Sequence, residues 1–163
     1  MSTIVNSSKP DSRLTQSKDK SRDYQALLER IPYARHLGLD LPKDAAGLVV
    51  RLPFHERLIG NFMLPALHGG VLGALIEITA RIAAQSEDAK ARRPRILDSN
   101  INYLRSAQAK HTFASAEIIR QGRRTSLVQV TCWQDKKNRP ITSGRVQLLF
   151  AKTDTNHQGD HEG

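Results

Sequence analysis

The chain has 163 residues with 39% hydrophobic and 25% charged side chains, which is enough for one domain with a sizeable core. No run approaches the roughly 20 apolar residues that span a bilayer, and the polar N-terminal segment lacks the hydrophobic core of a secretion signal. Cys132 is the only cysteine, which excludes an internal disulfide, so we expect a cytoplasmic protein with no membrane partner.

The net charge of +9 has four possible meanings: a nucleic-acid partner, an anionic membrane, an anionic small ligand such as a coenzyme, or a solvated basic surface. Aromatic residues make up only 5% of the chain and do not alternate with basic residues, as a base-stacking surface would require. We therefore expect no nucleic-acid partner, and we expect no membrane partner; the small anionic ligand and the solvated surface stay open.

Both ends of the chain are polar. Residues 1–22 are rich in Ser, Lys and Asp and predict a disordered basic tail, and residues 153–163 predict a second disordered tail. Residues 23–152 show no internal repeat and no second block of composition. They are therefore predicted to form a single domain.

The first elements of this domain are short. Apolar residues at helical spacing after Asp23 predict a helix that ends before Pro32. Residues 36–41 alternate as a strand does, and residues 47–52 are predicted to be the hairpin partner of that strand. Residues 53–67 are predicted to be an irregular loop, because they contain Gly60-Asn61 and Pro65.

A long helix is predicted over residues 69–85. Between Val71 and Ala84 only Glu77, Thr79 and Arg81 are polar, and a helix that is apolar nearly all round is a buried helix. Four strands are predicted after it, over residues 96–104, 111–121, 125–133 and 141–150, from their period of two. This order of elements predicts an α+β fold with a mainly antiparallel sheet wrapped around one helix.

The entry to the long helix is the sequence His68-Gly69-Gly70. The first N–H groups of a helix lack backbone partners, and glycine permits close approach of a ligand, so both glycine amides are candidates to bind an oxyanion. His68 is either a general base or a capping residue. Glu77, a carboxylate in an apolar run, is a candidate catalytic residue; the alternative is an ion pair with Arg81, four residues later.

The spacing of His68 and Glu77 has a consequence for assembly. Nine helical residues rise about 13 Å and turn through roughly 900°, which places the two side chains on opposite faces. One subunit cannot easily bring both to a small substrate, whereas two helices lying antiparallel across a two-fold axis can. If these residues form an active site, we expect an obligate dimer with two composite sites.

Other polar residues have both functional and structural interpretations. Asn61 either holds a water or carbonyl or is a turn residue, and Cys132 lies mid-strand as expected for inert packing. The arginines either bind phosphates or are simple loop charge: Arg105, Arg123 and Arg124. No Gly-rich phosphate loop, Ser-centred elbow or cluster of metal ligands occurs in the sequence, so no metal is expected.

Residues 67–77 resemble the signature of the PaaI-like hotdog thioesterases, which carry a His-Gly-Gly turn and an Asp or Glu nine residues after the His. Residues 100–107 resemble the following strand of that family, which usually ends in Tyr-Leu-Arg-Pro-Ala. Residues 121–124 resemble a later hairpin. The resemblance covers nearly all of residues 23–152, with the order of elements intact.

This resemblance implies a hotdog fold, in which one long helix is wrapped by a five- to six-stranded antiparallel sheet, assembled as dimers and often tetramers. It implies hydrolysis of acyl-CoA thioesters without a metal or other cofactor. Carried over by position, Glu77 is the general base or nucleophile, and Gly70 with Gly69 supplies the oxyanion contact. The implied positioning residues are Asn61 and His68, those lining the acyl pocket are Phe62, Met63 and Leu64, and those near the CoA phosphates are Arg105, Arg123 and Arg124.

Three positions depart from the family pattern. Ser106 replaces the usual Pro, and Ile96 stands where some relatives have a Ser or Thr that assists the chemistry. Arg81, one turn beyond Glu77, is not expected and would tend to neutralise that carboxylate. A buried Glu77–Arg81 pair would favour the alternative function, a non-catalytic domain that binds or senses acyl-CoA. The acyl group is not fixed by the sequence, and medium-chain and aromatic groups both stay open.

Overall fold

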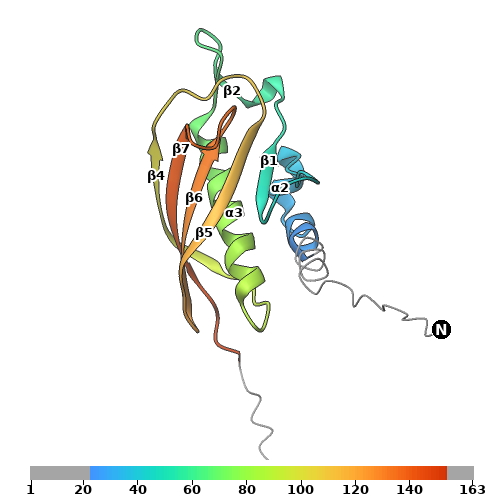
Figure 1. The fold of residues 1–163 in the computed structure, drawn as a ribbon, viewed down its shortest axis with the longest axis vertical. Helices are drawn as coiled ribbons and strands as arrows, with labels where there is room; N and C mark the ends of the chain where they lie inside the picture. The colour runs from blue at the N-terminus through green and yellow to red at the C-terminus, as the bar shows by residue number, and fades with distance from the viewer. Residues whose placement is uncertain (1–22, 154–163) are drawn as a thin grey trace, which may run out of the picture.

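The computed structural model describes residues 23–153. The predictions for the two tails lie outside this range, apart from Thr153, and the domain boundaries stay predictions. Five strands form an antiparallel sheet in the order β1-β5-β6-β7-β4 (Figure 1). These strands are β1 (Val49–Leu52), β4 (Arg95–Tyr103), β5 (Thr112–Gln121), β6 (Thr125–Trp133) and β7 (Thr142–Leu149).

Helix α3 (Gly69–Glu87) packs against one face of this sheet and contacts all five strands (Figure 1). Along β6 and β7 every second residue is buried, which is the pattern of one face against the helix and one face toward solvent. The predicted architecture, one long helix wrapped by an antiparallel sheet, is confirmed. It places Glu77 of α3 beside β4.

Two predictions for the N-terminal part are wrong. Residues 36–41 do not form a strand, because α2 (Pro32–Leu37) continues through His36. Pro32 is favoured at a first helical position, and Gly38 with φ 68° ends the helix in the left-handed region. Residues 47–52 are likewise not part of a local hairpin. The only bridge between the two segments joins Asp40 to Arg51, and β1 forms its ladder with β5.

The predicted loop 53–67 contains a small hairpin. It consists of β2 (Ile59–Asn61) and β3 (Ala66–Leu67), preceded by a 3₁₀ turn over Glu56–Leu58. The hairpin projects beyond the sheet (Figure 1), and its tip exposes Phe62, Met63 and Leu64 by 82%, 90% and 70%. Gly60 lies against His68, so the hairpin base and the start of α3 are packed together.

Strand β4 is an edge strand with unusual exposure. It pairs with β7 on one side and, within residues 23–153, with no strand on the other. Large apolar side chains are nevertheless exposed on it and just beyond it: Ile96, Leu97, Tyr103 and Leu104. An exposed edge with apolar side chains is typical of a surface that pairs with another chain.

Cys132 is fully buried on the inner face of β6, and burial raises the pKa of its thiol to about 12. A thiol that stays protonated is a poor nucleophile, so the predicted packing role is confirmed. No helix of the described part is long and apolar enough to span a membrane.

Candidate active site

The start of α3 is capped by its own histidine. His68 is the N-cap residue with extended backbone, and its Nδ1 accepts a hydrogen bond of 3.0 Å from the Gly70 N–H. The His68 carbonyl accepts from Val71 and Leu72, whereas within residues 23–153 the Gly69 N–H has no partner. In the single chain, therefore, the Gly69 amide is free to bind an anion, and the Gly70 amide becomes free if the imidazole rotates.

The glycines of the helix permit β4 to approach closely. A Cβ on Gly69 would lie 3.3 Å from the Tyr103 ring, and one on Gly73 would lie 3.2 Å from Ile101. The Tyr103 hydroxyl donates to the Gly69 carbonyl at 2.8 Å. Tyr103 thus fixes the first turn of the helix, a role that the sequence analysis missed.

Glu77 is half-buried between α3 and β4. The Ser99 hydroxyl donates to Glu77 Oε1 at 2.6 Å, a length typical of a charge-assisted hydrogen bond. No ion pair joins Glu77 to Arg81 among the described residues, although the spacing favours one. The alternative interpretation, a Glu77–Arg81 ion pair, is therefore not observed, and a hydroxyl group rather than a cation holds the carboxylate.

Ser99, and not Ile96, is the residue of β4 whose side chain contacts Glu77. On β4, Ser99, Ile101 and Tyr103 alternate toward the helix, and they contact Glu77, Gly73 and Gly69 in turn. Counting back along the strand from Tyr103 in steps of two residues reaches Ile101 and then Ser99, so strand alternation would have predicted that Ser99 faces the helix. The register shift between Ile96 and Asp98 breaks that period at the start of the strand, and this obscured the signal.

Asn61 is used as a turn residue in the single chain. Its Oδ1 accepts from the Met63 N–H at 2.9 Å, which stabilises the tip of the β2–β3 hairpin. The three apolar residues that follow are exposed to solvent. The base of the hairpin, at Gly60, packs against His68.

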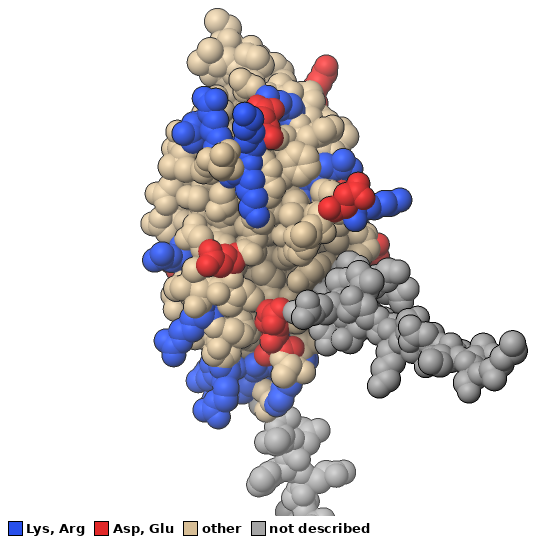
Figure 2. Space-filling model, viewed as in Figure 1, with Lys and Arg blue, Asp and Glu red and all other residues tan. Residues whose placement is uncertain are grey.

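The three candidate arginines do not form one cluster. Arg105 follows β4 and lines a hollow of about 830 Å³ at the β6–β7 hairpin, with Lys136 and Arg139. Arg123 and Arg124 lie at the opposite end of the sheet, in the β5–β6 hairpin. There they line a hollow of about 570 Å³ with Lys90, Arg92 and Lys152. Figure 2 shows basic side chains at both the upper and the lower end of the molecule.

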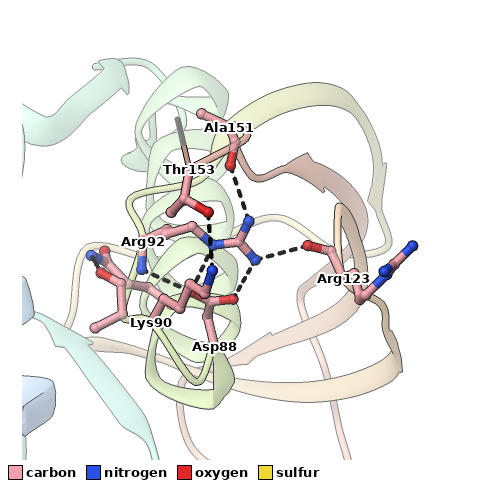
Figure 3. A network of polar contacts seen from close by, with 8 residues as sticks. Asp88, Lys90, Arg92, Arg123, Ala151 and Thr153 are labelled. Atoms are coloured by element: carbon pink, nitrogen blue, oxygen red, sulfur yellow. Dashed lines mark hydrogen bonds and ion pairs between the residues drawn. The ribbon is translucent and has the colours of Figure 1, made fainter. Parts of the chain in front are cut away.

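The lower basic hollow is built around Arg92 (Figure 3). Its guanidinium donates to the Asp88 carboxylate and to the carbonyls of Ala151 and Arg123, at distances between 2.7 and 3.1 Å. Hydrogen bonds from Arg92 lower the pKa of Asp88, and Asp88 raises the pKa of Arg92. Arg92 therefore joins the end of α3, the β5–β6 hairpin and the end of β7 and has a structural role, while the guanidinium groups of Arg123 and Arg124 form no ion pair within the described residues.

Residues 64–141 match the family model of the thioesterase superfamily. This range includes the helix mouth, Glu77 and Ser99. The resemblance to this superfamily is confirmed. Comparison with curated proteins finds no match.

Solved structures show the same fold as this chain. A protein from Chromobacterium violaceum is 29% identical, covers 88% of this chain and 100% of its own, and has a TM-score of 0.62. A putative esterase from Mycobacterium tuberculosis is 26% identical, with 76% and 98% covered and a TM-score of 0.66. The E. coli PaaI protein, from the phenylacetic acid degradation operon, is 19% identical, with 83% and 96% covered and a TM-score of 0.70. The predicted hotdog fold is thereby confirmed.

Proposed function

We propose that the protein hydrolyses acyl-CoA thioesters to the free acid and CoA. The observation that carries this proposal is the placement of Glu77, a half-buried carboxylate on the superfamily's central helix that is held by Ser99 and not neutralised by Arg81. A carboxylate so placed keeps a lone pair to activate water. A Glu77–Arg81 pair would have favoured the alternative of a non-catalytic binding domain, and the described residues form no such pair.

In the proposed reaction, Glu77 removes a proton from water as the oxygen attacks the thioester carbonyl. The negative charge that develops on the carbonyl oxygen is stabilised by the Gly69 N–H, and by the Gly70 N–H once the His68 ring has turned away. The carbon–sulfur bond then breaks, and the proton on Glu77 passes to the departing CoA thiolate. Direct attack by Glu77, with an acyl-anhydride intermediate that water later cleaves, is the alternative route.

We further propose that two subunits build each site. The unpaired edge of β4 and its exposed apolar side chains supply a surface for the same strand of a second copy. Across such a two-fold axis the α3 helices lie antiparallel, and the helix mouth of one chain faces Glu77 of the other. The basic residues Arg123 and Arg124, or Arg105 at the opposite end, then lie near the CoA phosphates, and the projecting Phe62 and Met63 near the acyl group.

The release of free thiol from a panel of acyl-CoAs is the direct test of this function. Turnover of at least one acyl-CoA is expected, and a panel that yields no thiol above the spontaneous rate would contradict the proposal. The panel also ranks acyl groups by kcat/KM. The buried thiol of Cys132 is not expected to react with the thiol reagent in the folded protein.

Replacement of Ser99 by alanine is expected to lower kcat by about tenfold, because the carboxylate of Glu77 loses its hydrogen bond and is no longer fixed toward the substrate. Ser99→Thr keeps the hydroxyl and should retain most of the activity. Steady-state kinetics with one acyl-CoA gives the comparison. Equal kcat values for the wild type and Ser99→Ala would show that this hydrogen bond does not contribute.

A shared site predicts complementation between inactive variants. Glu77→Gln removes the carboxylate, and Gly70→Val crowds the helix mouth, since a Cβ there already lies 3.1 Å from His68 Nδ1. Random mixing of the two variants produces hybrid dimers in which one site carries both changes and the other carries none. About half of the dimers are then hybrids and half of the sites in each hybrid are intact, so up to about one quarter of wild-type activity should return.

The two variants are unfolded together, refolded together and assayed, with each variant refolded alone as the control. If the mixture stays as inactive as its components, the helix mouth at Gly70 and the carboxylate of Glu77 in one site come from the same subunit.

A further inference from the structure

Arg81 is an unusual residue in an otherwise apolar helix. Between Leu72 and Gln85 the partly exposed residues of α3 form one stripe, Ala74, Glu77, Arg81 and Gln85, and the other residues of that segment are buried. Arg81 is half-buried and follows Glu77 by one helical turn, on the same side of the helix. A charge in this position is costly unless an opposite charge accompanies it.

Arg81 forms no ion pair and no hydrogen bond within the described part of the chain. Burial first, and the positive charge of Arg93 second, lower the pKa of Arg81. A half-buried guanidinium without a hydrogen-bond partner, one turn from a candidate catalytic carboxylate, is a group that a bound anion would stabilise.

We propose that Arg81 binds a carboxylate at the far end of the acyl group, so that the preferred substrates are CoA thioesters of short dicarboxylic acids. This inference rests on the proposed thioester hydrolysis at Glu77. It makes Arg81 a residue that determines specificity rather than one that suppresses the reaction.

The spacing along the helix selects the acyl group over the CoA phosphates as the source of the anion. Four helical residues rise about 6 Å, so the guanidinium lies about one turn from the carbonyl that Glu77 addresses. A chain of two or three methylene groups bridges a similar length. The long pantetheine arm, by contrast, holds the phosphates well away from the thioester.

The test compares two substrates that differ only in the distal charge: glutaryl-CoA and its neutral isostere, in which an isopropyl group replaces the carboxylate. The wild type is expected to show the higher kcat/KM with glutaryl-CoA. Arg81→Gln should lower that value about 10- to 100-fold while changing the value for the isostere by less than about threefold. Arg81→Lys keeps the charge without the bidentate fork and should retain an intermediate preference.

Arg145→Gln is the matched control, because Arg145 is exposed on the outer face of β7, away from α3. It should change neither kcat/KM value. Circular dichroism and the elution volume on gel filtration establish that each variant is folded and assembled as the wild type is. If Arg81→Gln fails to fold, the Arg81→Lys variant and the wild-type substrate ratio still decide the question.

Three outcomes would overturn the inference. An equal loss on both substrates in Arg81→Gln would place the guanidinium against CoA or against a carboxylate of the partner subunit. A wild type that cleaves the isostere as fast as glutaryl-CoA would show that no distal anion is recognised, while the proposed hydrolysis at Glu77 would stand. Absence of thiol release from every acyl-CoA would overturn both the hydrolysis and this inference.

Discussion

Glu77→Gln is expected to lower kcat for acyl-CoA hydrolysis by about 10²- to 10⁴-fold, because the amide cannot accept the proton of the attacking water. The substitution is nearly isosteric, and the amide oxygen of Gln can still accept the Ser99 hydrogen bond at the position of Oε1. Local packing between α3 and β4 should therefore persist. Steady-state thiol release measures the loss, and the thermal midpoint should stay within a few degrees of that of the wild type.

The matched control is Glu117→Gln, which makes the same chemical change on an exposed residue of β5. It is expected to leave kcat and KM unchanged. If Glu77→Gln retains wild-type turnover while folding normally, then Glu77 does not activate water, and another group must do so. If KM rises while kcat is unchanged, Glu77 contributes to substrate binding only.

The second large effect concerns the packing of α3 on the sheet. Ile76 is fully buried. A Cβ added to Gly144 of β7 would lie 2.8 Å from Ile76 Cγ2. Ile76→Ala is expected to reduce the free energy of unfolding by about 2–5 kcal/mol, through lost apolar burial and the cavity that remains. Gly144→Ala alone should reduce it by about 1–3 kcal/mol, because the added methyl group overpacks the interface.

The two changes should compensate each other. In the Ile76→Ala background the added methyl group of Gly144→Ala finds space, so the double variant should be more stable than the sum of the single changes predicts, by about 1 kcal/mol or more. Denaturant unfolding of the four proteins measures this coupling. Ile119→Ala, at a strand position that is 48% exposed, is the control and should cost less than about 1 kcal/mol. Additive effects would mean that α3 shifts away from β7 rather than clashing with it.

The sequence determined the elements whose pattern is long and local. Helix α3 begins at the predicted Gly69 and ends two residues past the predicted end. It was predicted well because the helical, mostly apolar pattern extends over the 17 residues 69–85. Strand β6 has the predicted bounds, since its alternation runs over nine residues. The six-residue alternation at 36–41 was too short to be decisive, and Pro32 with Gly38 set a helix there instead.

The tertiary structure decided the partners of the candidate site. Sequence spacing alone favoured Arg81 as the partner of Glu77, but a helix neighbour competes with groups on any strand that packs beside it, and β4 brings Ser99 within 2.6 Å. Likewise, the sequence could not show that His68 holds the Gly70 amide, or that Arg105 and Arg124 lie at opposite ends of the sheet. The sequence determined which chemical groups are present at the helix mouth and on α3, because residue types and helical periodicity are local properties. Only the tertiary structure determined which of them meet, because those contacts join residues that are distant in the chain and depend on strand order and register.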